Sequence, residues 1–314
     1  MTVTPKLLLP LAALSAIVFT ACGGSEETSS EVKIPDAPDA AIQTIGKELL
    51  DGNGGILWQA MPASYQADVN AIAQLAGSKV DPELYDKSFG LIGRIAEVAD
   101  KQKEFILNTK LGGPQPAEQI AKVEAAWPSI IGFVQTIANS SIASSAGLQS
   151  FDGLAFCTDT VSPLVQYSKD LSALSEEENP FDTIDFGAVK LLESTDSTAV
   201  LEMTSPDGTV ESEEFMKVEN RWVPTEMATQ WGTNMADAKA QLEAITPEQM
   251  AQNKPQIMGV VTMLEGVLIQ IEAAETQEQF DQALQGAMMP IMGLMMMQGG
   301  MGGGQSAPAM PVAP

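Results

Sequence analysis

The sequence predicts an α+β fold that is predominantly helical and carries a small antiparallel meander of three to four strands. Up to about residue 178, apolar residues recur three and four positions apart, which is the spacing of amphipathic helices. Between 185 and 226 the pattern changes to short runs rich in Val, Thr and Leu, separated by turn-forming residues. Helical spacing returns from Gly232 onward. With 45% hydrophobic residues, the chain can bury a core.

The region 37–178 divides into helical units at its Gly and Pro residues. Ser64 stands where its hydroxyl would cap a helix. Asp81 before a proline forms a helix-start signature, and Pro128 is expected to bend its helix or to split it after Trp127. The predicted units are 40–51, 56–77, 82–108, 117–139 and 148–174, the last with a restart at Pro163.

Four short runs predict the meander, and Asp207-Gly208 between two of them is typical of a hairpin turn. In the second run Ala199, Leu201 and Met203 share one face. Pro224 cannot donate a ladder hydrogen bond, so the last run is expected at a sheet edge. The predicted strands are Asp185–Glu193, Thr198–Thr204, Thr209–Val218 and Arg221–Glu226.

The C-terminal part is expected to be helical, with helices that pack back on the first half. One helix is predicted to begin at Asn234, a second at Thr246-Pro247, and a third after Lys254-Pro255. The third, 256–274, is mostly apolar, which favours a central buried helix. Thr276 and Gln279 resemble a capping box that opens the last helix, and the Gly- and Pro-rich tail 298–314 is expected to be disordered.

The chain begins with the pattern of a secretory signal peptide. Lys6 provides a positive charge, and Leu7–Phe19 is an apolar run that is too short to span a bilayer, which needs roughly 20 residues. The run ends in Phe19-Thr20-Ala21-Cys22, which resembles the lipobox of bacterial lipoproteins. An ordinary secreted protein, or a buried N-terminal helix, is the alternative interpretation of this stretch.

The resemblance implies that Cys22 carries lipid and anchors the mature chain to a membrane. Gly23 follows Cys22 where an Asp would favour retention, which implies the periplasmic face of the outer membrane. The stretch Leu57–Asn70 also resembles uncharacterised bacterial envelope lipoproteins. The expected organisation is a signal peptide 1–21, a flexible tether 22–36, a helical region 37–178, the meander with C-terminal helices 179–297, and the tail 298–314. Whether the body forms one domain or two stays open.

Composition excludes several classes of function. The chain has 16 Lys and Arg against 41 Asp and Glu, a net charge of −25, which opposes binding to nucleic acid because that binding depends on basic side chains. It contains no histidine, which removes Ser-His-Asp and Cys-His catalysis and the commonest zinc ligand. The acidic surface favours solubility, and capture of a cation is the alternative.

The chain has two cysteines. If Cys22 is acylated, Cys157 has no partner within the chain and cannot form an internal disulfide. Its neighbours Ala155 and Phe156 are apolar, so we predict a buried, inert thiol.

Methionines near the C-terminus are the one unusual chemical feature. Thioethers select Cu(I), and Met288, Met292, Met295 and Met296 are candidate ligands if they share a helical face. Met is also an adaptable apolar filler, and the apolar period continues from Phe280 into the cluster, so packing is the favoured interpretation and no metal site is predicted.

No catalytic residue and no cofactor is predicted either. Acidic runs such as Glu176-Glu177-Glu178 and Glu211-Glu213-Glu214 are expected to be solvated. The local Ser-x-x-Lys, Ser30 to Lys33, falls in the tether. The expected function is therefore that of a lipid-anchored cell-envelope protein, a non-enzymatic binding or structural module. The alternatives are a Cu(I)-binding envelope protein and a hydrolase that needs no histidine.

Overall fold

The computed structural model describes residues 32–111, 113, 115–172, 174, 188–205 and 208–286. Within them the chain is predominantly helical and holds a four-stranded antiparallel sheet, so the predicted α+β class is confirmed. The predicted signal peptide, Cys22, the candidate metal ligands Met288, Met292, Met295 and Met296, and the tail 298–314 lie outside the described residues.

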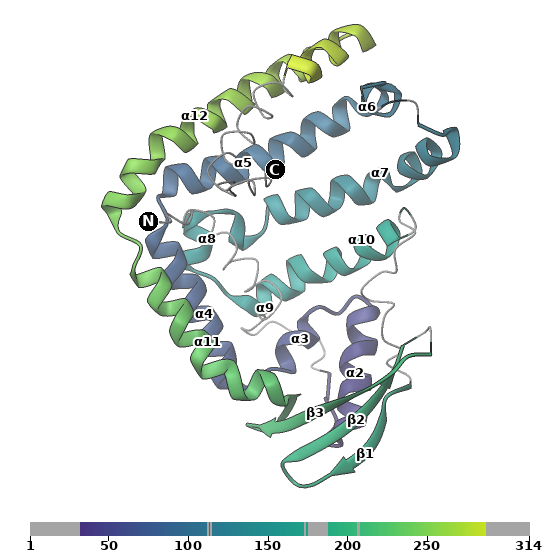
Figure 1. Ribbon diagram of the computed structural model, residues 1–314, viewed down its shortest axis with the longest axis vertical. Coiled ribbons are helices and arrows are strands. Elements are labelled where there is room, and N and C mark those ends of the chain that lie inside the picture. Colours follow the sequence, from purple (N-terminus) through teal and green to yellow (C-terminus); the bar gives the residue numbers. More distant parts are fainter. Residues whose placement is uncertain are drawn as a thin grey trace, which may run out of the picture.

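Helices α12 (Pro247–Glu272), α5 (Pro82–Lys101), α7 (Ala117–Ala138) and α10 (Ser162–Ser172) lie side by side in that order and form a layer one helix thick (Figure 1). Helices α12 and α5 run parallel. Near their starts Lys254 Nζ lies 2.9 Å from Asp81 Oδ2, and near their ends Lys101 Nζ lies 3.2 Å from Glu272 Oε1. The C-terminal helices therefore pack back on the first half, as predicted.

Helix α12 corrects two predictions. A capping box between Thr246 and Gln249 starts it, and it continues through Pro255 without the predicted restart. It lies at the edge of the layer (Figure 1), and of its apolar side chains only Val261 and Ile271 are buried. The prediction of a central buried helix over 256–274 is therefore wrong. Apolar composition alone does not tell a buried helix from one at an edge.

The predicted unit 82–108 is interrupted at Gln102, between α5 and α6 (Lys103–Asn108). Only 6% of Gln102 is exposed, and its amide donates to the carbonyls of Ile271, Glu272 and Ala274 at distances of 2.8 to 3.2 Å. These carbonyls belong to the end of α12, where helical partners are missing. The break therefore places a side chain that caps α12 and fixes its end against α5.

The main core lies between α3 (Gly55–Gln59), α4 (Ala63–Lys79) and α11 (Thr225–Glu243). Tyr65 and Trp231 stack there with ring centroids 4.0 Å apart, and Trp231 Nε1 donates to Asp68 Oδ2 at 2.9 Å. Helix α11 begins at Thr225 and not at Asn234 as predicted, because Gly232 is accommodated inside the helix.

Strands β1 (Lys190–Ser194), β2 (Thr198–Thr204), β3 (Val210–Val218) and β4 (Arg221–Pro224) follow one another in the sheet in chain order. Ala199 pairs with Phe215, and both pack with Leu201 in a cluster that includes Ala41 of α2 (Pro38–Leu50). Helix α2 thus covers one face of the sheet (Figure 1). Pro224 lies in an edge strand, as predicted.

The turn between β3 and β4 also caps a helix. Glu219 and Asn220 have positive φ angles of 46° and 62°, as a two-residue type I′ hairpin requires. The Glu219 carboxylate accepts a hydrogen bond from the backbone N–H of Ser64 at 3.1 Å, in the first turn of α4. The predicted cap by the Ser64 side chain is therefore wrong, because α4 makes no cap bond from its own N-cap residue and a carboxylate from the sheet takes that place.

Helix α7 is continuous through Pro128, although Pro128 cannot donate to the carbonyl of Glu124. The prediction of a split at this proline is wrong. Three short segments then lead back to α10: the 3-10 turn η1 (Ser141–Ala143), α8 (Ser145–Gln149) and α9 (Gly153–Phe156). Between α9 and α10 the chain forms one turn of π-helix, η2 (Cys157–Val161).

Candidate functional site

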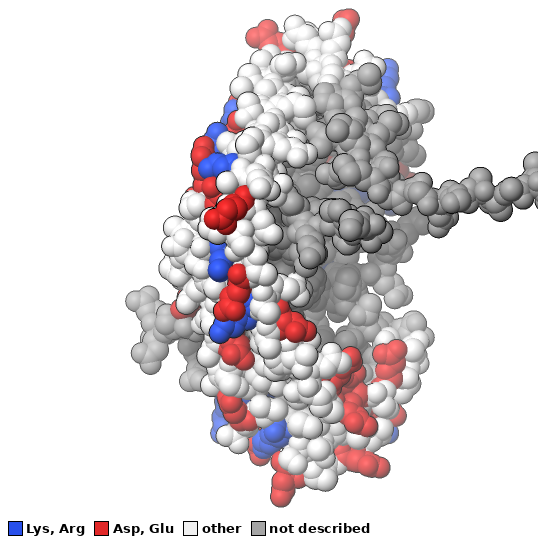
Figure 2. Space-filling model, turned by 60° about the vertical axis from the view of Figure 1, so that its left-hand side comes forward, with Lys and Arg blue, Asp and Glu red and all other residues white. Residues whose placement is uncertain are grey.

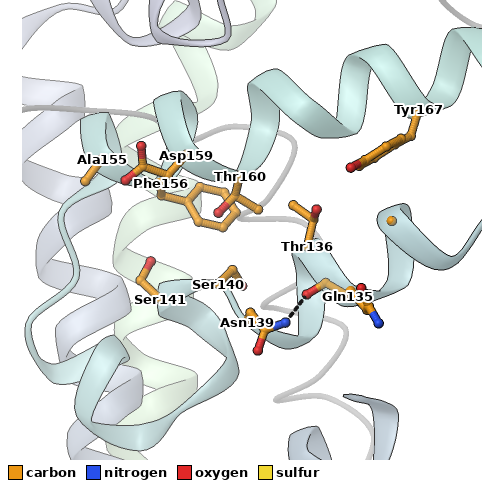
Figure 3. A pocket seen from close by; sticks show the side chains of 11 residues that line it. Gln135, Thr136, Asn139, Ser140, Ser141, Ala155, Phe156, Asp159, Thr160 and Tyr167 are labelled. Carbon is orange, nitrogen blue, oxygen red and sulfur yellow. Dashed lines mark hydrogen bonds between the residues drawn. The ribbon is translucent and has the colours of Figure 1, made fainter. Parts of the chain in front are cut away.

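A cavity of about 410 Å³ lies where the C-terminal half of α7 faces η2 and α10 (Figure 3). One wall comes from α7 and the turn that follows it, and the other from α9, η2 and α10. The lining residues are Gly132, Gln135, Thr136, Asn139, Ser140, Ser141, Ala155, Phe156, Asp159, Thr160 and Tyr167.

The lining is rich in hydrogen-bonding groups and poor in charge. Hydroxyl groups come from both walls, and Gln135 and Asn139 add amides that both donate and accept. Asp159 is the one carboxylate among the lining residues and is exposed, and they include no Lys or Arg. The cavity can therefore exchange hydrogen bonds with an uncharged molecule in both directions.

Two neighbouring serines in the wall differ in how their hydroxyls are used. Ser140 Oγ donates to the carbonyl of Ile137 at 2.7 Å. Ser141 Oγ is buried and has no hydrogen-bond partner within the described part of the chain. A buried hydroxyl without a partner costs about 1–3 kcal/mol. A buried hydroxyl without a partner calls for an explanation, and a ligand bound beside the cavity wall would provide one.

Gly132 makes room for the aromatic ring that closes the other end of the cavity. A Cβ atom on Gly132 would lie 2.5 Å from Tyr167 Cζ and 2.7 Å from its hydroxyl oxygen, closer than real Cβ atoms approach. The ring thus rests directly on the α7 backbone. Beside this contact, Ser129 Oγ donates to Asp170 Oδ2 at 2.6 Å and ties α7 to α10.

The π-helical turn η2 places Asp159 and Thr160 at the cavity. A π-turn inserts an extra residue into a helix and shifts the side chains that follow, and such turns are frequent at functional sites. Thr160 is 4% exposed and faces the α7 wall (Figure 3). Without η2, α9 and α10 would form one regular helix, and Asp159 and Thr160 would point in other directions.

Cys157 is the first residue of the same π-turn, and one part of the prediction for it is wrong. It is 1% exposed, so its burial is confirmed. It is disulfide-bonded, however, so the prediction of a thiol without a partner is wrong. That prediction assigned the sulfur of Cys22 to lipid and thereby left Cys157 alone. Acylation and a disulfide between the chain's two cysteines would use the same sulfur, so one chain carries only one of them.

The sequence-predicted sites do not meet in this cavity. Cys22 and the methionine candidates Met288, Met292, Met295 and Met296 lie outside the described residues, as do Glu176-Glu177-Glu178 and Ser30. Glu211, Glu213 and Glu214 lie on β3, far along the chain from the cavity lining. Across the described ranges no cluster of three or more Cys, Asp or Glu side chains could hold a metal ion.

Sequence reasoning missed the cavity because its two walls are far apart in the chain. Residues 132–141 and 155–167 meet only after α8 and α9 have turned the chain back. One local signal was present in α7, where Gln135, Thr136 and Asn139 interrupt an otherwise apolar helix end. The π-turn has no equivalent signal in the sequence.

None of the helices in the described part of the chain combines the length and apolarity needed to cross a membrane. In comparisons with known proteins, no protein-family model, no curated protein and no solved structure matches this chain.

Proposed function

We propose that this protein is a lipid-anchored component of the bacterial cell envelope that binds a small, uncharged polar molecule in the α7–α10 cavity. The anchor is Cys22, at the end of the predicted signal peptide, on the periplasmic face of the outer membrane. The observation that carries the binding role is the cavity wall, which combines hydroxyl and amide groups with a buried, orphaned Ser141 hydroxyl.

The charge of the site favours a neutral ligand. An anion would find no Lys or Arg among the lining residues and would meet Asp159 at the rim. The whole chain carries a net charge of −25, which adds a repulsive field for anions. Acidic side chains gather at the sheet end of the molecule (Figure 2), where β1 to β3 carry Glu193, Glu202, Glu211, Glu213 and Glu214.

The size of the cavity fits a small molecule. Ligand pockets usually enclose about 300–1,000 Å³, and 410 Å³ lies near the lower end of that range. The Tyr167 ring and Phe156 offer apolar surface beside the polar groups, an arrangement suited to a sugar or another polyol with both hydroxyls and C–H faces.

The same lining supports binding over hydrolysis. Acid–base hydrolysis of a glycosidic bond uses two carboxyl groups, and a Ser-Lys mechanism needs a lysine beside the nucleophile. The lining residues supply one carboxylate, Asp159, and no lysine. Our proposal is therefore a binding module, in which Ser141 and its neighbours hold the ligand without transforming it.

A thermal-shift titration tests the proposal. The mature protein is titrated with neutral sugars and polyols, and with the uronates of the same sugars as anionic counterparts. We expect at least one neutral compound to raise the melting temperature in a saturable way, and its uronate to have a much smaller effect. The shift should be lost in Ser141→Ala and kept in Ser150→Ala, because Ser150 is exposed and donates to the carbonyl of Ala146 outside the cavity. Absence of any shift, or a shift that survives Ser141→Ala, would contradict the proposed site.

A further inference from the structure

The four-helix layer has an apolar side that the described residues do not bury. It is formed by Ile92 and Ile95 of α5, Ile130 and Phe133 of α7, and Val260 and Leu264 of α12, which we call the apolar face. Ile92 and Ile95 are 37% and 45% exposed, and the other four are half-buried. Two exposed and four half-buried apolar side chains on three adjacent helices form an apolar patch, and such patches often mark a contact surface.

Contacts on the flanks of α5 place its two isoleucines on one side of the layer. Arg94 reaches Glu272 of α12 on one flank, and a Cβ on Gly93 would lie 3.5 Å from Ala138 of α7 on the other. At 100° per residue, Ile92 and Ile95 project between these flanks. The opposite side of α5 carries Gly90 and Glu97, both exposed.

The neighbouring helices present their apolar residues to the same side. In α7, Trp127 donates to Asp100 of α5 and Ser129 to Asp170 of α10, so Ile130 and Phe133 project between those flanks. Gln135 and Asn139, which line the cavity, project to the opposite side. In α12 the flank toward α5 is fixed by Lys254 and Glu272. Helical spacing then places Val260 and Leu264 on the apolar face and Ile269 on the reverse.

A segment of the same chain has the matching chemistry. Residues 287–297 read Ala-Met-Met-Pro-Ile-Met-Gly-Leu-Met-Met-Met, without one polar side chain. The other long apolar run outside the described residues, Leu7–Phe19, belongs to the predicted signal peptide and is removed with it. Methionine is flexible and polarizable, so it can fill the irregular surface that three adjacent helices create.

The segment also starts in the right place. The helix formed by 277–286 packs beside the end of α5 and α6, where Phe280 is 1% exposed in a cluster with Val98. Gln277 Nε2 donates to the carbonyl of Phe105 at 3.0 Å, and Thr109 Oγ1 donates to Asp281 Oδ1 at 2.7 Å. From there, eleven residues reach about 16 Å as a helix or about 36 Å when extended. Helix α5 is about 30 Å long at 1.5 Å per residue.

We infer that residues 287–297 dock on the apolar face and cover it. The methionine cluster is then a packing element of the body, and its position on the side opposite the cavity leaves the proposed ligand site open. The inference goes beyond the proposed function and does not depend on it, because it concerns the other side of the layer.

Truncation separates the docking segment from the tail. We compare the mature chain with chains ending after Met297 and after Gly286. The chain ending at Met297 should match the full chain in melting temperature and in fluorescence of an apolar-surface dye. The chain ending at Gly286 should melt several degrees lower and bind several-fold more dye. Equal behaviour of all three chains would overturn the inference.

A double-mutant cycle identifies the surface that the segment covers. Ile95→Glu should lower the melting temperature of the chain ending at Met297 and leave the chain ending at Gly286 unchanged, because the docking partner is already missing. Ile269→Glu is the matched control: Ile269 is 64% exposed on the reverse of the layer, so its substitution should have little effect at either length. Equal effects of Ile95→Glu at both lengths would overturn the inference. So would a dimer that Ile95→Glu dissociates at both lengths, since a second copy would then cover the face.

Discussion

At the residue scale, the orphaned hydroxyl of Ser141 links stability to binding. Because Ser141 Oγ is buried without a described partner, Ser141→Ala should raise the free energy of unfolding of the ligand-free protein by about 1 kcal/mol. Ser140→Ala should lower it by about 0.5–1.5 kcal/mol, since it removes the 2.7 Å bond to the Ile137 carbonyl. Urea denaturation of the two variants measures the difference. Equal destabilisation by both would show that Ser141 already has its hydrogen bond.

Gly132 provides a second test at this scale, because its missing side chain admits the Tyr167 ring. Gly132→Ala should lower the melting temperature and displace the ring, since the new Cβ would meet Tyr167 Cζ at 2.5 Å. The control is Gly259→Ala on α12, where nothing lies within 4 Å of the Cβ position. That substitution should stabilise by roughly 0.5–1 kcal/mol, because glycine is costly inside a helix. A stabilising Gly132→Ala would mean that the ring does not rest on α7 in solution.

Two individual residues, Ser64 and Cys157, were predicted wrongly from the sequence. Ser64 is of a residue type that often caps helices, yet it lies inside the first turn of α4 and a carboxylate from a distant hairpin provides the cap. The prediction of a free Cys157 thiol rested on the number of cysteines in the chain. That number does not show whether the Cys22 sulfur carries lipid or forms a disulfide. Both outcomes depend on which distant residues meet, and a local pattern does not carry that information.

At the scale of elements, carboxylates that cap helices or form ion pairs between them make the fold sensitive to acid. Hydrogen bonds from Ser64 lower the pKa of Glu219, the bond from the Leu84 backbone lowers the pKa of Asp81, and the bond from Lys101 lowers the pKa of Glu272. A carboxyl group whose pKa is lower in the folded state stabilises the fold above its unfolded pKa, near pH 4–4.5. That contribution disappears as the pH falls through the lowered pKa.

The helix cap from the hairpin can be tested through this pH dependence. Below about pH 4.5, the wild type should lose stability faster than Glu219→Gln, because the amide keeps its acceptor oxygen and does not titrate. The stability difference between the two proteins should therefore shrink as the pH falls. Glu211→Gln on exposed β3 serves as the control. Parallel pH profiles of wild type and Glu219→Gln would contradict the proposed cap.

Elements could be predicted from the sequence where a local pattern decides them. The strands β2, β3 and β4 follow their predicted runs closely, because turn-forming residues separate them. Helix breaks were less predictable. Helix α11 continues through Gly232, and α7 and α12 continue through prolines where a break was predicted. In each case packing along the helix outweighs one unfavourable residue. No local sequence pattern predicts the interruption at Gln102. Its side chain bonds to carbonyls at the end of α12, which is far away in the chain.

At the scale of the whole molecule, the layer has two sides with different chemistry. One side carries the polar cavity between α7 and α10, and the other carries the apolar face. The sequence indicates that each helix carries apolar residues. It does not indicate which of these residues stay exposed when four helices lie in one layer. Neither the cavity nor the apolar face could be predicted, because both are created by helices that are distant in the chain.

The central claim is that Cys22 carries lipid and anchors this body to the envelope. The most direct measurement is intact-mass and peptide mass spectrometry of the mature protein purified from membranes without reductant. We expect an N-terminal Cys22 that bears diacylglycerol. A mature chain whose Cys22 carries no lipid, and is joined to Cys157 by a disulfide, would contradict the claim.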